Sequence, residues 1–172
     1  YTLPSSAYES AKTIRNYFTV GAQLLRRNAK IVRYNVLGEL RTTGKEWGEF
    51  NVEGDASLNI PFLKDTLHII ADGYVRNEQP SFFYEHFHGR NAVGDKSLDM
   101  ECRTRSGGAV KYKDTRLSFH FETIQNYTTF AETLEPYSDE DGLRLYRHSV
   151  QPIQTAKNLR VTEASISQDF HW

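Results

Sequence analysis

The chain has 172 residues, a formal net charge of −1 and 25% charged residues, which is the length of one domain. Its aromatic content of 13% is too high for a disordered chain, and its near-neutral charge gives no electrostatic reason to expect a nucleic-acid partner. No stretch approaches the ~20 apolar residues of a membrane-spanning helix, whereas a membrane β-barrel strand needs only about 9–11 residues with every second one apolar.

We expect one β domain over residues 1–172, with an irregular lead-in at 1–15 that contains Pro4 and several serines. The chain begins at Tyr1 without a Met or a signal peptide, so we expect a mature product or a fragment. The one cysteine, Cys102, cannot form an intramolecular disulfide.

The strongest local signal is an alternation with period 2. From Glu46 to Ile60, one parity is apolar or small (Gly48, Phe50, Val52, Gly54, Ala56, Leu58, Ile60) and the other is strongly polar. Successive side chains of a strand point to opposite faces, so this segment predicts a strand with one apolar and one polar face.

Seven further segments show the same pattern, more weakly towards the end of the chain. In chain order they are 18–24, 32–41, 66–76, 98–105, 116–122, 143–154 and 164–170. The segment Leu143–Gln154 is the least regular because Pro152 cannot donate to a ladder. The pattern predicts an all-β protein: an antiparallel up-and-down meander of about eight long strands, forming a transmembrane β-barrel or part of a larger one.

The expected connections differ in length at the two ends of these strands. Short turns are predicted at 26–29, 61–65, 113–115 and 155–158, and the opposite end carries 42–45 and the long segments 77–96 and 127–142. Short turns at one end and long loops at the other are typical of outer-membrane barrels.

Alternation does not decide which face meets lipid. In a soluble barrel that binds a small apolar ligand, the apolar face points inward, and in a membrane barrel it points outward. The apolar parity is rich in Gly and Ala, which would leave voids in a core but not against lipid. On the membrane assignment, the polar parity lines a lumen, with candidate pore-lining residues Arg33, Glu39, Arg41, Glu49, Glu53, Asp55, Asp72, Arg76, Glu101, Arg103, Arg105, Arg116, His120 and Glu122.

The stretch from Glu49, EFNVEGDASLNIPFLKDTLHIIADGYVRNEQPSFFYEHFHGRNAVGD, resembles the putative porin family of Bacteroidetes outer membranes, as do the blocks RTRSGGAVKYKDTRLSFHFETIQNYTTFAE and TEASISQDFHW. The resemblance implies a bacterial outer-membrane channel for passive diffusion of small hydrophilic solutes, in contact with membrane lipid and without a cofactor. Because members of that family are longer, it also implies that the chain is a section of a larger barrel, completed by remaining strands or other subunits.

Two constellations are compatible with a metal. His86 and His88 lie two residues apart, and the acidic segment 135–142 offers carboxylate oxygens. Neither has the spacing of a complete site, so we interpret them as surface loops. The carboxylates of Glu49, Glu53 and Asp55 recur along a strand opposite basic residues, which indicates a salt-bridged wall and not acid–base catalysis. We therefore expect no enzyme activity.

Overall fold

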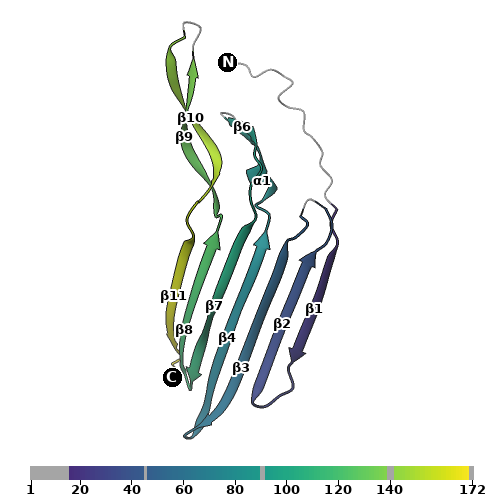
Figure 1. Cartoon of the computed structure of the whole chain (residues 1–172). Helices are drawn as coiled ribbons and strands as arrows, with labels where there is room; N and C mark the ends of the chain where they lie inside the picture. The colour runs from purple at the N-terminus through teal and green to yellow at the C-terminus, as the bar shows by residue number, and fades with distance from the viewer. Residues whose placement is uncertain (1–15, 45, 90–91, 139–141, 171–172) are drawn as a thin grey trace.

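The computed structural model describes residues 16–44, 46–89, 92–138 and 142–170. The expected lead-in at 1–15 lies outside the described residues. Seven strands form one sheet in the order β1-β2-β3-β4-β7-β8-β11 (Figure 1). Their bounds are β1 (Thr19–Arg26), β2 (Val32–Arg41), β3 (Phe50–Phe62), β4 (Asp65–Glu78), β7 (Glu101–Tyr112), β8 (Thr115–Gln125) and β11 (Leu159–Gln168).

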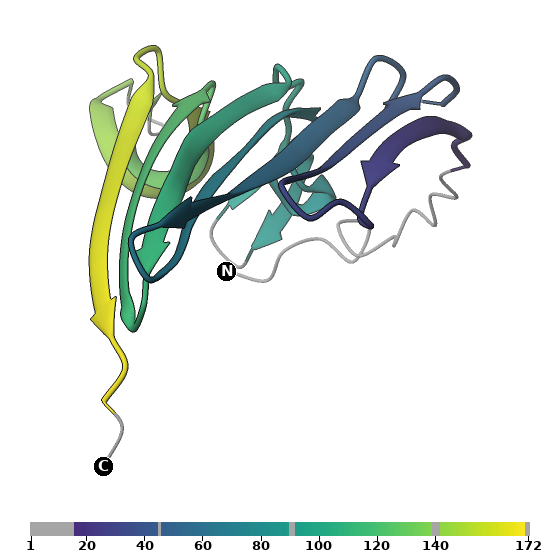
Figure 2. The ribbon, with the colours of Figure 1, turned by 90° about the horizontal axis from the view of Figure 1, so that it is seen from below.

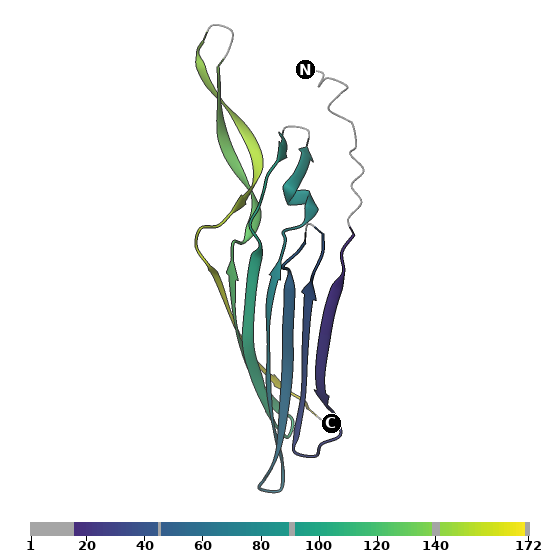
Figure 3. The same ribbon diagram turned by 45° about the vertical axis from the view of Figure 1, so that its right-hand side comes forward.

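The remaining elements lie in two of the connections. A short helix α1 (Phe82–Glu85) and the hairpin of β5 (His86–Gly89) and β6 (Ala92–Asp95) follow β4, and the hairpin of β9 (Thr128–Ser138) and β10 (Arg144–Gln154) follows β8. In two views, β9 and β10 extend beyond the end of the main sheet (Figures 1 and 3). The two hairpins and the short helix therefore lie outside the main sheet.

All neighbouring strands in the main sheet are antiparallel, which confirms the predicted meander. Two-residue turns join β3 to β4 and β7 to β8, with the first turn residues, Leu63 and Lys113, at positive φ. These turns and the 27–31 connection lie at one end of the sheet, which we call the short-turn end. The segments 42–49, 79–100 and 126–158 lie at the other, the long-loop end. The predicted asymmetry of the connections is confirmed for these segments.

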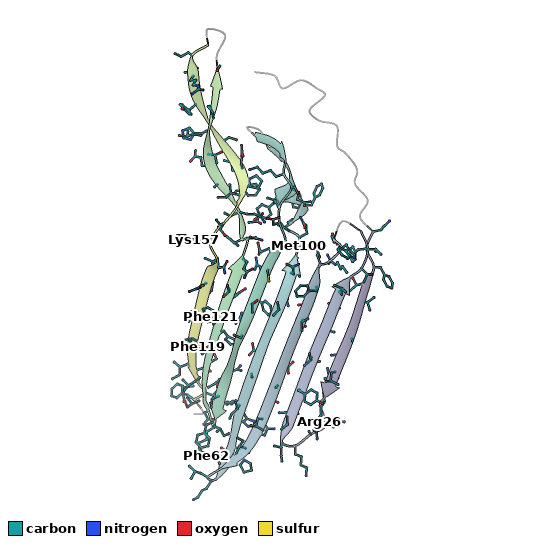
Figure 4. The ribbon with its side chains drawn as sticks, in the orientation of Figure 1. Arg26, Phe62, Met100, Phe119, Phe121 and Lys157 are labelled. Carbon is teal, nitrogen blue, oxygen red and sulfur yellow. The ribbon has the colours of Figure 1, made fainter. Side chains whose placement is uncertain are left out.

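The prediction was wrong for the segment between β8 and β11. The expected loop 127–142 contains β9, and the expected sheet strand 143–154 is β10, which pairs with β9 alone while β8 pairs directly with β11. The sheet consequently has seven strands, and the turn 155–158 lies at the long-loop end, where Thr155 donates its backbone N–H to Tyr127 O at 3.0 Å. Figure 4 shows Lys157 near the same end as Met100.

The physical reason is that a projecting hairpin shows the same alternation as a sheet strand. Pro136 and Pro152 both lie in this hairpin, opposite Tyr146 and Phe130. Each strand of a two-stranded hairpin is an edge strand with a neighbour on one side only. The backbone N–H that a proline lacks is therefore not needed by a second neighbouring strand. The weaker alternation of Leu143–Gln154 and the proline within it therefore agree with a strand that lies outside the main sheet.

The projecting hairpin is bound to the connection between β4 and β7. Lys96 Nζ donates to Pro152 O at 3.0 Å, and Gln154 exchanges two hydrogen bonds with the backbone of Asp99, at 2.9 and 2.7 Å. The rings of Tyr84 and Phe130 lie 4.9 Å apart. The two long segments thus form one assembly at the long-loop end.

The main sheet is a single layer without a hydrophobic core. Ala109 and Ile124, at 5% exposure each, are the only buried apolar side chains in the described strands of the main sheet. The accessible surface area is 13437 Å², compared with roughly 8,700 Å² expected for a compact folded protein of this mass. Many large apolar side chains are exposed, so the fold requires an environment that covers them.

The sheet is open. β1 and β11 are its edge strands and do not pair with each other. Viewed from below, it is curved and twisted (Figure 2). The part of the chain that the structure describes contains no helix long and apolar enough to cross a membrane.

Candidate functional site

The strand register sorts the side chains of the main sheet onto two faces. Directly paired residues share a face, so the series Gln23, Leu37, Glu53, Tyr74, Arg105, Glu122 and Val161 runs across one face, which we call the polar face. All the predicted pore-lining residues within the strands belong to it: Arg33, Glu39, Arg41, Glu53, Asp55, Asp72, Arg76, Glu101, Arg103, Arg105, Arg116, His120 and Glu122. Glu49 precedes β3 and contacts Arg41 at its long-loop end.

The polar face is the concave face of the sheet. Three of its contacts cross an intervening strand: Tyr74 Oη donates to Glu122 Oε1 at 3.0 Å across β7, His120 lies 3.2 Å from Asp72 across β7, and Arg105 pairs with Glu163 at 3.2 Å across β8. Side chains converge on the concave side of a curved sheet and diverge on the convex side. The two buried apolar residues, Ala109 and Ile124, also lie on this face.

Hydrogen bonds connect neighbouring strands across the polar face. Arg76 donates to Asn51 Oδ1 and Glu53 Oε2, at 3.0 Å each. Gln23 Nε2 donates to Asn35 Oδ1 at 2.6 Å, and Asn35 Nδ2 donates to Asp55 Oδ1 at 3.2 Å. These contacts form two polar clusters, one from β1 to β3 and one between β3 and β4, which a water-filled space would solvate.

Gly107 makes the contact between His120 and Asp72 possible. Its register partners are Asp72 on one side and His120 on the other. A Cβ at residue 107 would lie 2.4 Å from His120 Cδ2 and 2.4 Å from Phe119 O. The imidazole therefore occupies the space that a side chain at this position would take, and only 15% of the His120 side chain is exposed.

A buried carboxylate lies at the long-loop end of the polar face. Glu49 is 5% exposed, pairs with Arg41 and accepts the backbone N–H of Gln79 at 3.0 Å. Arg41 also pairs with Glu46 at 2.7 Å. Burial raises the pKa of Glu49 above its ordinary value, although the Gln79 N–H and the Arg41 guanidinium act in the opposite direction. This group fixes the connection between β2 and β3 against the segment after β4.

The opposite, convex face is apolar over most of its length. Within the described strands, its only charged residues are Arg26, Asp65 and Arg160, each at or next to a strand end. Large side chains on it are exposed, including Phe119 at 55%, Leu117 at 53% and Val52 at 45%. Phe119 and Phe121 lie on β8, and Phe62 lies at the short-turn end (Figure 4).

The apolar face has the height of a bilayer. β3 has 13 residues, which is about 43 Å at 3.3 Å per residue, or roughly 33 Å along the membrane normal at a tilt of ~40°. The hydrocarbon core of a bilayer is about 30 Å thick. A convex apolar band of this height has the dimensions of a lipid-facing surface.

Two hollows lie on the polar face. One, of about 300 Å³, is lined by Asn35, Glu53, Gly54, Asp55, Asp72, Gly73, Tyr74 and Arg105. The other, of about 440 Å³, lies nearer the long-loop end and includes Arg41, Glu49, Arg76 and Glu78. Both are open to solvent and predominantly lined by residues that form hydrogen bonds or carry charge.

Sequence reasoning did not assign Tyr74 or Glu163 to the polar face, although both form contacts across it. Tyr74 interrupts the apolar/polar alternation of its strand, although its hydroxyl is a polar group at the end of a long side chain. Glu163 lies in β11, where the pattern is weak. Ala164 pairs with Phe119 and therefore lies on the apolar face. Because successive side chains of a strand alternate between faces, this placement assigns the preceding residue, Glu163, to the polar face.

The two segments compatible with a metal lie partly outside the described residues. The side chains of His86 and His88 lie outside the described residues, and so do residues 139–141 of the acidic segment 135–142. Among the residues whose side chains the structure describes, no three His, Cys, Asp or Glu residues form a group that could hold a metal ion. Chemically, the polar face offers a network of ion pairs and hydrogen bonds along an open surface.

One family model, described as "Putative porin", matches residues 2–172 of the chain. No curated protein and no solved structure matches it.

Proposed function

Because the chain belongs to this porin family, we propose that it forms part of the wall of an outer-membrane β-barrel channel through which small hydrophilic solutes diffuse passively. The polar face would line the lumen, and the convex face would contact lipid. The solutes cross without chemical change, so the proposal requires neither a cofactor nor catalytic groups.

The observation that carries the proposal is the distribution of polarity over the curved sheet. The concave face holds the ion pairs and the convex face holds exposed Phe, Leu and Val side chains. In water, such a convex surface would promote aggregation, whereas lipid would cover it. A membrane barrel has this arrangement, with apolar residues outside and polar residues inside.

The same observation disfavours a soluble barrel that binds an apolar ligand. Such a barrel places its apolar side chains on the concave face and its charged side chains on the convex face. In the described strands, Arg76, Arg103 and Arg105 lie on the concave face and Val36, Val52 and Phe119 on the convex face. An interior lined by these arginines would not bind an apolar ligand.

We also propose that further strands complete the barrel. Seven antiparallel strands alternate in direction, so β1 and β11 run in the same direction. If the sheet closed on itself, β1 and β11 would have to pair in parallel. Two copies of this chain with their long loops on the same side of the membrane would also have to pair through parallel strands. Bacterial single-chain barrels have an even number of antiparallel strands. The completing segment would therefore contribute an odd number of strands.

Extraction and transport measurements on the protein at its native length test this proposal. It should fractionate with the outer membrane, require detergent for extraction, and migrate as a compact band on gels unless boiled. Reconstituted into liposomes, it should admit small neutral sugars at a rate that falls with solute size. A freely soluble protein without detergent, or liposomes as tight as protein-free ones, would contradict the proposal.

A further inference from the structure

Charges are distributed unevenly along the strand direction of the polar face. Towards the long-loop end, the four arginines Arg41, Arg76, Arg103 and Arg105 each pair with a carboxylate, from Glu49, Glu53, Glu101 and Glu163 respectively. The strands of the same part of the face carry five more carboxylates, on Glu39, Asp55, Asp72, Glu78 and Glu122. Counting the strand residues and Glu49, nine carboxylates minus four arginines leave an excess of five negative charges.

The short-turn end of the same face has the opposite sign. Lys111 and Arg116 are a direct pair near the turn between β7 and β8, and Arg33 lies near the start of β2. None of these three residues, which we call the basic belt, forms an ion pair with a described carboxylate. The two zones of the face thus carry opposite net charge.

Asp55 and Asp72 are the most unusual members of the acidic zone. They are direct cross-strand partners on β3 and β4. Asp55 accepts a hydrogen bond from Asn35, and Asp72 contacts His120 at 3.2 Å. Neither forms an ion pair with a Lys or Arg among the described residues. Like charges directly opposite each other in a sheet are destabilising, so this pair lowers the stability of the fold.

Both aspartates border the hollow of about 300 Å³, together with Glu53, Tyr74 and Arg105. The side chain of Asp72 is 39% exposed, and Asp55 is also exposed. Gly107, the residue of β7 paired with Asp72, has no side chain, and the imidazole of His120 from β8 contacts Asp72 at this position. The two carboxylates therefore face a solvent-filled hollow large enough for a hydrated cation.

We propose that the lumen bordered by this face prefers cations over anions, and that the Asp55–Asp72 pair is its principal charge-selecting element, with the basic belt acting against it. This inference rests on the proposed channel function. Carboxylates facing a lumen favour the passage of cations, and low-dielectric walls strengthen their field. Asp55 and Asp72 together hold two of the five excess charges at adjacent positions, so their removal affects the preference most.

Reversal potentials in planar lipid bilayers under a KCl gradient test this inference on the protein at its native length. The wild-type channel should be more permeable to K⁺ than to Cl⁻. The double variant Asp55→Asn/Asp72→Asn should lower the K⁺/Cl⁻ permeability ratio by at least about twofold, because it weakens the local enrichment of cations. The control Lys111→Gln/Arg116→Gln should raise the ratio.

The stability of the variants separates a selective role from a structural one. Because the double variant relieves a like-charge contact, its compact unboiled band should persist to the same or a higher temperature than that of the wild type. If the double variant does not fold, Asp55→Asn alone should lower the ratio in the same direction. A wild-type preference for Cl⁻, or a ratio unchanged in the folded variants, overturns the inference. Absence of any conductance contradicts the channel function itself.

Discussion

Gly107 shows at the level of one residue why the polar network has its present form. Asp72 lies on β4 and His120 on β8, with β7 between them. The two side chains meet only because Gly107, their register partner on β7, has no side chain to separate them. Gly107 thus creates room for the imidazole of His120.

The first prediction concerns this position. Gly107→Ala should destabilise the folded protein by about 1–3 kcal/mol, because the new Cβ would overlap His120 and Phe119 O. Gly38→Ala is the matched control, since a Cβ at residue 38 would meet nothing within 4 Å. Urea unfolding in detergent measures both. Equal stabilities for the two variants would show that the space around Gly107 is not required.

A second prediction at this scale concerns Arg41 and the buried Glu49. The raised pKa of Glu49 means that the folded protein binds this proton more tightly than the unfolded chain does. The stability that Glu49 contributes is therefore fully present below its ordinary pKa of 4.5 and is lost as the pH rises through the higher pKa of the folded state. Arg41 limits this loss by pairing with the ionised carboxylate.

Arg41→Gln should consequently destabilise the protein more at neutral pH than at pH values below the ordinary pKa of Glu49. The double variant Arg41→Gln/Glu49→Gln should lose most of this pH dependence, because glutamine still accepts the Gln79 N–H but carries no charge. Urea unfolding at a series of pH values measures the effect. A pH dependence of the Arg41→Gln effect that survives the second substitution would show that another group causes it.

At the scale of single strands, period 2 predicted the seven strands of the main sheet, although residues 106–112 of β7 and 159–163 of β11 lay outside the predicted segments. The sequence could not reveal which strands are neighbours, because β10 alternates as the sheet strands do, and only pairing with β9 places it outside the sheet. It also could not identify contacts such as Tyr74–Glu122, which depend on curvature that brings residues of non-adjacent strands together. The residues of the polar face were predictable from parity, and their partners were not.

Two adjacent residues of β2 provide a test of the faces. Val36 lies on the convex face and is 42% exposed, whereas Leu37 lies on the polar face opposite Glu53. Val36→Lys should reduce membrane folding by about 2–4 kcal/mol, the cost of a lysine facing the bilayer midplane. Leu37→Lys should be nearly neutral, because its ammonium group can reach Glu53 and water.

The yield of folded, protease-resistant protein after insertion into lipid vesicles compares the two variants. In a water-soluble sheet the order would be reversed, since a lysine would improve an exposed apolar face. A Val36→Lys variant that inserts as well as wild type would therefore count against the lipid-facing assignment.

At the scale of the whole molecule, the sheet lacks a core and has two open edges. These properties would be defects in an isolated soluble domain. In the proposed membrane barrel both would be removed, since lipid would cover the convex face and further strands would pair with β1 and β11. Figures 1 and 3 show the long connections extending from one end of the sheet only. A short-turn end and a long-loop end agree with an orientation in which the long loops face the cell exterior.

The central claim, that the convex face contacts lipid and the concave face contacts water, is tested most directly by a spin-label scan along β8 in lipid bilayers. Single cysteines replace residues 117–122 in turn, in a Cys102→Ser background, and the accessibility of each label to oxygen and to a water-soluble nickel chelate is measured. We predict that labels at Leu117, Phe119 and Phe121 are accessible to oxygen, and that labels at Ser118, His120 and Glu122 are accessible to the chelate. The opposite assignment, or no alternation, would contradict the account.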